Sequence, residues 1–336
     1  MPISQHIWTH AEINTLFEKP FMELLSMAHH IHEQHFDPNE VQISGLLNFK
    51  TGLCPEDCGY CAQSHKYDTG VVLEQTMSVD QVVALAKKSQ QLGSTRFCMA
   101  AAWRIPPKKA FERCLAMVTA VKALGMETCM TIGTLTLEQA QALKVAGLDY
   151  YNHNLDTSPE HYPNIITTRP YSERLQTIEY VRQAGLNICC GGILGMGESR
   201  TDRISLLLQL LAMPEYPRSV PLNVLEPIPG TPLEKCEALD NFEFIRTVAV
   251  TRIVMPEAVI RLSGGRPHMS DEMQALCFFV GANSIHYGEK LLTTPNCNPE
   301  ADKALFKRLG LRSMVPAGVT SSNNFMTTSN SAEVVN

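Results

Sequence analysis

Three cysteines occur close together in one short segment of the sequence. Cys54, Cys58 and Cys61 are spaced C-x3-C-x2-C, just after an apolar stretch. Thiolates are soft ligands that suit iron–sulfur clusters or zinc. A 4Fe–4S cluster normally takes four cysteines, so three nearby thiolates leave one iron open to another ligand. The spacing favours such a cluster over its alternative, a zinc knuckle that a distant Cys or His would complete.

Three further cysteines lie in separate apolar segments. Cys98 and Cys129 are 31 residues apart, and Cys189 follows 60 residues later. These separations correspond to roughly one and two βα units of a barrel. If the strand faces that carry them point inward, three thiolates converge, and they repel one another unless a metal holds them. The residues alone leave a metal site and ordinary buried cysteines equally open.

Polar residues alternate along another strand candidate. Tyr150, Asn152, Asn154 and Asp156 share one face of the segment. Such a face does not suit an aliphatic core. It predicts a pocket that hydrogen-bonds a polar ligand, with a partly solvated strand end as the alternative.

Four histidines cluster near the N-terminus but do not form a recognised zinc motif. His32 and His35 are one residue too close for H-E-x-x-H, so they do not share the required helical face. We expect His29, His30, His32 and His35 to lie on an exposed face of a helix.

The elements that must position these residues alternate between strands and helices. Ser78 and Thr136 each begin a capping box, with Gln three residues later. Helices are expected to end at Gly93, Gly125 and Gly147, and again at Gly185, each shortly before a strand candidate. Eight strands are predicted, at 41–49, 96–101, 128–131, 150–154, 187–191, 222–225, 259–262 and 283–286.

This alternation predicts an α/β fold, a TIM-type (β/α)8 barrel over residues 41–315. A barrel of six units, open on one side, would produce a similar pattern. Residues 1–40 are expected to form an N-terminal helical extension. Residues 316–336 are rich in Ser, Asn and Thr and are expected to be a disordered tail.

Composition limits the class of protein. The 336 residues carry a net charge of −6 without a basic block, which argues against a nucleic-acid partner. The apolar stretches are too short to span a membrane, and the N-terminus lacks a secretory signal. We therefore expect a cytoplasmic protein, in which the 11 cysteines do not form a disulfide framework.

The loop motif resembles that of the radical S-adenosylmethionine (SAM) superfamily. Over about residues 40–315 the chain is similar to the biotin synthase family. The matching stretches are 51–61, 96–103, 151–157, 189–193, 230–233 and 291–295.

The resemblance implies two iron–sulfur clusters and two sets of ligand contacts. A 4Fe–4S cluster that binds SAM would be held by Cys54, Cys58 and Cys61. A 2Fe–2S cluster would be held by Cys98, Cys129, Cys189 and Arg261, although arginine is an unusual ligand. SAM contacts would come from Tyr60, Asp156, Gly191, Gly192 and Ile193. Contacts to dethiobiotin would come from Asn154, Asn223, Thr293 and Thr294.

The implied activity is radical SAM-dependent insertion of sulfur into dethiobiotin to form biotin, with the 2Fe–2S cluster as sulfur donor. The implied partners are a flavodoxin-type or reductase electron donor, an iron–sulfur assembly system and a second copy in a homodimer. The alternatives are a radical SAM enzyme with another small substrate, or a zinc- or cluster-binding protein without catalysis. The remaining cysteines are expected to be structural: Cys114, Cys190, Cys236, Cys277 and Cys297.

Overall fold

The computed structural model describes residues 6–288 and 290–314. Within them, eight parallel strand positions close into a barrel, because β1 pairs with both β2 and β9. The predicted TIM-type barrel is therefore confirmed, and the open six-unit alternative is wrong. The barrel strands are β1 (Glu40–Lys50), β2 (Arg96–Ala101), β3 (Glu127–Thr131), β4 (Tyr150–Asn152), β5 (Asn187–Cys189), β7 (Ser219–Val224), β8 (Val259–Leu262) and β9 (Ala282–Tyr287). A short extra strand, β6 (Gly192–Leu194), follows β5 and also pairs with β7.

Three strand predictions, those for β4, β5 and β7, were wrong by two or more residues at one end, and β5 ends at Cys189 rather than at residue 191. β7 begins three residues earlier than predicted, at Ser219. The added stretch contains Pro221, a residue that lacks an N–H and is rare within central strands. β4 ends at Asn152, so the polar alternation does not continue as a strand. The N–H groups of Leu155 and Asp156 both donate to the carbonyl of Gly191, and Asp156 has a φ of 68°.

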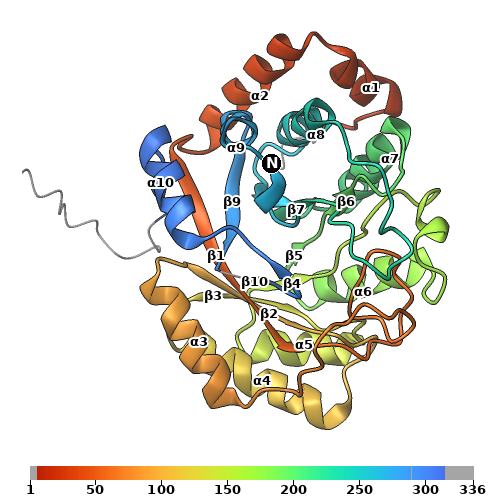
Figure 1. Ribbon diagram of the computed structural model, residues 1–336, viewed down its shortest axis with the longest axis vertical. Coiled ribbons are helices and arrows are strands. Elements are labelled where there is room, and N and C mark those ends of the chain that lie inside the picture. The colour runs from red at the N-terminus through yellow and green to blue at the C-terminus, as the bar shows by residue number, and fades with distance from the viewer. Residues whose placement is uncertain (1–5, 289, 315–336) are drawn as a thin grey trace, which may run out of the picture.

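Helices surround the strands in Figure 1. The α-helices between β1 and β8 are α3 (Val79–Gln91), α4 (Lys108–Lys122), α5 (Leu137–Val145), α6 (Tyr171–Gln183), α7 (Arg200–Leu211) and α8 (Asn241–Val254). Both predicted capping boxes are present, since Ser78 and Thr136 accept from the N–H of Gln81 and Gln139. The four predicted glycine stops all have positive φ values. Local sequence signals thus marked these helix ends correctly.

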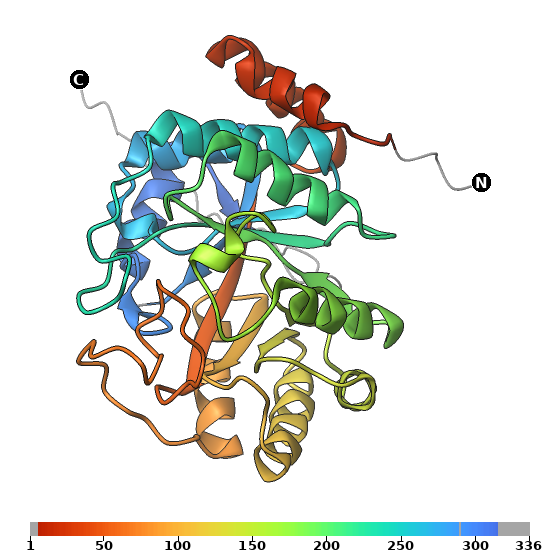
Figure 2. The same cartoon turned by 90° about the vertical axis from the view of Figure 1, so that its right-hand side faces the viewer.

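Two helices precede the barrel, α1 (His10–Glu18) and α2 (Phe21–His35). They lie at one side of the molecule, where α1 contacts α7 and α8, and α2 contacts α8 (Figure 2). Ile13, Phe17, Leu24 and Ala28 are buried in the same core as the barrel helices. The two helices are therefore packed onto the barrel rather than separated from it.

The histidine cluster on α2 is not uniformly exposed, which corrects the prediction for one of its members. His30 and His35 are exposed, but the side chain of His32 is 0% exposed. Within the described part of the chain, neither ring nitrogen of His32 has a hydrogen-bond partner. Burial, reinforced by the charge of Arg252, lowers the pKa of His32 to about 3.

This buried histidine predicts a loss of stability in mild acid. Below pH 6.5 the unfolded chain takes up a proton at position 32 that the folded chain excludes. The free energy of unfolding therefore decreases as the pH is lowered. His32→Leu removes this penalty, which amounts to about 2 kcal/mol at pH 5. We expect the melting temperature of the variant to exceed that of the parent by more at pH 5 than at pH 7. The exposed His35→Leu is the matched control, and an equal gain in both variants would contradict the prediction.

The C-terminal part of the described chain returns to the mouth of the barrel. η2 (Arg266–His268) and α9 (Asp271–Phe279) connect β8 to β9, and β10 (Lys290–Leu291) and β11 (Thr294–Pro295) form a hairpin after it. α10 (Pro299–Leu309) and β12 (Arg312–Ser313) follow, and β12 pairs with β1. Buried Arg266 binds Asp302 of α10 at 2.6 and 2.7 Å and also donates to the carbonyl of His286. Arg266 thus links a residue just before the hairpin to a residue just after it.

The predicted disordered tail, residues 316–336, lies outside the described residues. Among the helices within 6–288 and 290–314, none combines the length and the apolar character that crossing a bilayer requires.

Candidate active site in the barrel

The three loop cysteines line a cavity at the mouth of the barrel. They follow β1, and the cavity that they line has a volume of about 320 Å³. The loop is held by its backbone, since Cys54 donates to Gln63 and Gly59 donates to Ile165, both at 2.9 Å. The structure therefore brings Cys54, Cys58 and Cys61 to one side of one space, at the strand ends where barrel active sites lie.

A carboxylate fastens this loop to the segment before α6. Asp57 accepts from the N–H groups of Thr167 and Thr168 at 2.9 and 3.1 Å. Burial opposes its ionisation, but these hydrogen bonds hold the pKa of Asp57 at about 2. Asp57 thus stays ionised at neutral pH and keeps the loop in place.

The free thiols of the loop are favoured over thiolates. Burial raises the pKa of Cys58 to about 12 and that of Cys61 to about 11, and it also raises the pKa of Cys54. A bound metal reverses such preferences because its charge stabilises the thiolate. The backbone of the loop is therefore held in place without a metal, whereas its cysteines are protonated until one binds.

The three strand cysteines meet inside the barrel. Cys98 and Cys129 are direct neighbours across β2 and β3, and Cys189 lies on β5, two strands beyond β3. Together with Arg261 they line a smaller cavity of about 120 Å³. The side chains that sequence periodicity placed on shared faces are thus on the inner side of the barrel.

A hydrogen-bonded polar layer contacts these cysteines. Arg261 donates to Ser284 and Ser44 at 3.0 Å, and Arg96 donates to Glu127 at 2.6 Å and Ser219 at 3.3 Å. The thiol of Cys189 also contacts the hydroxyl of Ser219, at 3.3 Å. Both arginines are about 1% exposed. Two buried guanidinium groups therefore face a set of thiols instead of the usual aliphatic layers of a barrel.

This environment favours negative charge on two of the strand cysteines, Cys98 and Cys189. Hydrogen bonding with the thiol of Cys129 lowers the pKa of Cys189 to about 5, despite burial, and Arg261 and Arg96 add to the effect. The same causes lower the pKa of Cys98, whereas the pKa of Cys129 is raised well above its ordinary value. The strand set can thus carry anionic charge in the interior, which the loop set does not.

The two cavities adjoin. The residues that line both are Thr131, Asn152, Asn154, Asn223, Leu291 and Leu292. Asn154 accepts from Asn152 at 2.9 Å and from the N–H of Gly191 at 3.2 Å. Asn223 donates to the carbonyl of Gly192 and accepts from the N–H of Gly264. Two amides with fixed orientations therefore lie between the two cysteine sets.

Two residues with an implied SAM role contact each other. The hydroxyl of Tyr60 donates to Asp156 at 2.7 Å, and Arg174 binds the same carboxylate oxygen at 2.6 Å. Tyr60, Asp156 and Ile193 all line the larger cavity. A phenol, a carboxylate and an apolar side chain there could hold a nucleoside by hydrogen bonds and packing.

Gly191 and Gly192 are required by strand packing. A Cβ on Gly191 would lie 2.0 Å from the carbonyl oxygen of Pro221, and one on Gly192 would lie 2.8 Å from that of Asp156. Neither glycine is among the residues that line the two cavities. The structure therefore explains them by the close approach of neighbouring backbone, a reason that the sequence did not indicate.

Thr293 and Thr294 lie on the hairpin at the mouth and line the larger cavity. The Thr294 hydroxyl donates to the carbonyl of Leu291 at 3.1 Å. These residues are far from the loop cysteines along the chain. The pairing of β1 with β9 closes the barrel and brings both segments to the same mouth.

Sequence reasoning missed several buried residues that line the cavities. Arg169, Arg174 and His153 face the larger cavity, and His286 faces the smaller one. Burial lowers the pKa of both histidines well below the ordinary value, so they are neutral. Within residues 151–154, alternation along the strand indicated only the asparagines. No spacing pattern in the sequence indicated the two arginines or His286.

The residues present suit clusters better than a single ion. In the part of the chain that the structure describes, no three His, Cys, Asp or Glu side chains converge as one ion requires. Ligands of a cluster bind different irons and need not converge on one point. Three cysteines facing a larger cavity fit a cluster with one open iron, and three cysteines beside buried Arg261 fit an anionic cluster.

Comparisons with known proteins agree with this arrangement. Residues 49–210 match the Radical SAM superfamily, and residues 221–312 match the Biotin and Thiamin Synthesis associated domain. Biotin synthase of Ectopseudomonas mendocina is 60% identical over 309 residues, which cover 92% of this chain and 88% of that protein. Biotin synthase of Xanthomonas oryzae pv. oryzae is 56% identical, covering 93% and 91%.

Solved structures show the same fold. Methylornithine synthase (PylB) has a TM-score of 0.78 at 17% identity and covers 93% of this chain and 96% of its own. The FeFe-hydrogenase maturase HydG from Carboxydothermus hydrogenoformans has the same score and identity, covering 92% and 76%. At this identity the likeness concerns the fold alone.

Proposed function

Because the chain belongs to the biotin synthase family, we propose that it inserts sulfur into dethiobiotin to form biotin, with a 2Fe–2S cluster as the sulfur donor. The observation that carries this proposal is the pair of adjoining cavities. Each is lined by its own set of three cysteines, and Asn154 and Asn223 belong to both. Sulfur insertion needs a substrate carbon within reach of a radical source on one side and a sulfur source on the other.

The loop cysteines, Cys54, Cys58 and Cys61, would hold a SAM-binding 4Fe–4S cluster, and Cys98, Cys129, Cys189 and Arg261 would hold the sulfur donor. When reduced, the SAM-bound cluster supplies a 5′-deoxyadenosyl radical that removes hydrogen from an unactivated carbon. The two buried guanidinium groups beside these thiols support the second assignment, since a 2Fe–2S cluster binds anionic thiolates.

SAM would be held in the larger cavity by Tyr60, Asp156 and Ile193, with Gly191 and Gly192 shaping the strand end behind them. The hydrogen bond between Tyr60 and Asp156 supports this role, because it fixes the orientation of a carboxylate that lines this cavity. A carboxylate is a suitable acceptor for ribose hydroxyls.

Dethiobiotin would lie across the shared wall. Its ureido ring offers both donors and acceptors, which the fixed amides of Asn154 and Asn223 complement. Its carboxylate would meet Thr293 and Thr294 at the mouth. Such anchoring at both ends orients a flexible chain, and orientation is the main contribution that a protein makes to radical chemistry.

The two cavities share apolar residues from the hairpin. Leu291 and Leu292 line both of them. An enclosed site keeps a reactive radical from attacking solvent or protein. We propose in addition a cytoplasmic location, a flavodoxin-type or reductase electron donor, repair by an iron–sulfur assembly system, and a homodimer, as the family resemblance implies.

The test is anaerobic turnover of dethiobiotin by the reconstituted chain with SAM and a reductant. Biotin and 5′-deoxyadenosine are expected, from protein that carries about six irons, four in one cluster and two in the other. Formation of 5′-deoxyadenosine without biotin would instead indicate another substrate, and a preparation that binds only zinc would refute the assignment.

A further inference from the structure

His286 is a buried histidine with an unpartnered ring nitrogen. It lies on β9 and is 7% exposed, and its Nδ1 is enclosed without a hydrogen-bond partner in residues 6–288 and 290–314. Its backbone is held firmly, since its carbonyl accepts from Arg266 at 3.1 Å and from Asn296 at 3.0 Å. Leaving a polar atom unpaired in the interior is costly. The position of this ring therefore needs an explanation.

The ring of His286 faces the inside of the barrel. Successive residues of a strand point to opposite sides. Ile285 and Tyr287 pack in the hydrophobic core. On the other side of the same strand, Ser284 accepts from Arg261 at 3.0 Å, and His286 lines the smaller cavity but not the larger one. His286 therefore belongs to the space around the strand cysteines.

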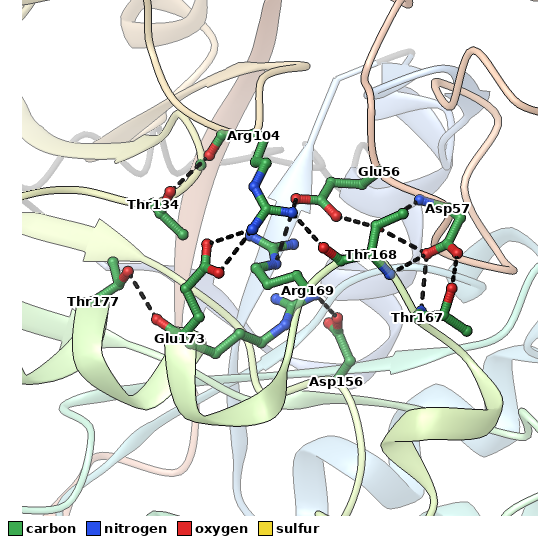
Figure 3. Close-up of polar contacts among 12 residues, drawn as sticks. Glu56, Asp57, Arg104, Thr134, Asp156, Thr167, Thr168, Arg169, Glu173 and Thr177 are labelled. Atoms are coloured by element: carbon green, nitrogen blue, oxygen red, sulfur yellow. Dashed lines mark hydrogen bonds and ion pairs between the residues drawn. The ribbon is translucent and has the colours of Figure 1, made fainter.

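Other unpartnered atoms lie beside the larger cavity, where opposite charges compensate for them. Nε of Arg169 and Oε1 of Glu56 are 3.8 Å apart, and Arg104 approaches the same oxygen at 3.2 Å. Figure 3 shows this ionic network. No ion pair among the described residues includes His286, and none of the other unpartnered side chains there lines the smaller cavity. The imidazole is thus the uncompensated polar group of that cavity.

His286 is neutral, so its ring carries one N–H donor. Burial lowers its pKa well below the ordinary value, and the positive charge of Arg261 adds to the effect. Phenylalanine would fill the same space without burying a nitrogen, so packing alone does not explain an imidazole here. A donor in this position is explained by an acceptor inside the cavity.

We propose that the ring N–H of His286 donates a hydrogen bond to a sulfur atom of the 2Fe–2S cluster. The inference rests on the proposed function, which puts that cluster at Cys98, Cys129 and Cys189. Such a cluster presents thiolate and sulfide sulfur atoms as acceptors, and it would occupy the cavity that the ring lines. Hydrogen bonds to the sulfur atoms stabilise an added electron and raise the reduction potential of a cluster.

His286→Phe tests the proposal because it keeps a ring and removes both nitrogens. The midpoint potential of the 2Fe–2S cluster is measured in the full chain with both clusters present. Electron paramagnetic resonance follows the titration at a temperature at which the 4Fe–4S signal is broadened. At a fixed solution potential, the ratio of reduced to oxidised 2Fe–2S cluster is expected to fall about tenfold, the effect of one hydrogen bond. This ratio corresponds to a midpoint about 59 mV lower for a one-electron couple.

His286→Gln retains an N–H donor and is expected to shift the midpoint less than His286→Phe. His153→Phe is the matched control. His153 is also buried and neutral and has an unpartnered Nε2, but it lines the larger cavity. It is expected to leave the midpoint of the 2Fe–2S cluster at the parental value. About six irons per chain in each variant show that both clusters are present. Equal shifts in His286→Phe and His153→Phe would indicate a general effect of polarity and overturn the proposal.

A second arm tests dethiobiotin as the acceptor, with its affinity measured by equilibrium dialysis in the presence of SAM. If His286→Phe weakens dethiobiotin binding and leaves the midpoint unchanged, the ring binds the substrate, and the assignment to the cluster is overturned. An unchanged midpoint with unchanged affinity overturns it as well. If the midpoint responds but the parent forms no biotin, the proposed function fails and the role of His286 stands. Biotin formation by a parent whose midpoint does not respond to His286→Phe refutes only the role of His286.

Discussion

Cys189→Ala is expected to abolish biotin formation while SAM binding at the loop cysteines persists. Cys189 lines the smaller cavity with Cys98, Cys129 and Arg261, and the described part of the chain offers no other thiol in that cavity. Without it, a 2Fe–2S cluster lacks one of its ligands, and the sulfur donor is lost. Iron should fall from about six to about four per chain. Biotin formation should fall by at least ~10³-fold, the scale seen when an essential catalytic group is removed.

The neighbouring Cys190 provides a matched control for this experiment. It is also fully buried, but it packs in the core outside the strand cysteines and lines neither cavity. Cys190→Ala is expected to keep about six irons and to form biotin at a rate near that of the parent. Biotin formation by Cys189→Ala at the parental rate would refute the sulfur-donor role of the strand set.

Cys58→Ala is expected to remove all radical chemistry. Cys58 is the most central of the loop cysteines in the motif, and its side chain is 7% exposed beside the larger cavity. Two remaining thiolates are too few to hold a 4Fe–4S cluster that also binds SAM. Neither 5′-deoxyadenosine nor biotin should form, a loss again of at least ~10³-fold, while about two irons remain in the strand site.

This second result separates the two cysteine sets. Cys236 packs against the small apolar cluster that contains Cys58, and its Sγ donates to the carbonyl of Gly195 at 3.2 Å. Cys236→Ala is therefore the control for local packing and should retain 5′-deoxyadenosine formation. Loss of about four irons from Cys58→Ala and about two from Cys189→Ala would support two independent sites. Equal losses in both variants would indicate a single site.

Much of the fold could be predicted because its signals are local. The strands at 96–101 and 259–262 were predicted with their observed bounds, and the capping boxes at Ser78 and Thr136 are present. Each depends on residues within one turn or one strand. Prediction was wrong where a distant contact decided the structure. β4 ends early because Leu155 and Asp156 bind Gly191, and His32 is buried because α2 packs on α8.

The sequence by itself determined the spacing of the loop cysteines and the strand periodicity that turns three other cysteines inward, because both depend on neighbours along the chain. Only the tertiary structure decided the charges around them. Arg261 meets Ser44 across 217 residues, and Arg96 meets Ser219 across 123. Arg169 faces the loop cavity without a hydrogen-bond partner in the described chain. Burial and pairing arise only when remote segments pack together, so no local pattern could reveal the partners of these guanidinium groups.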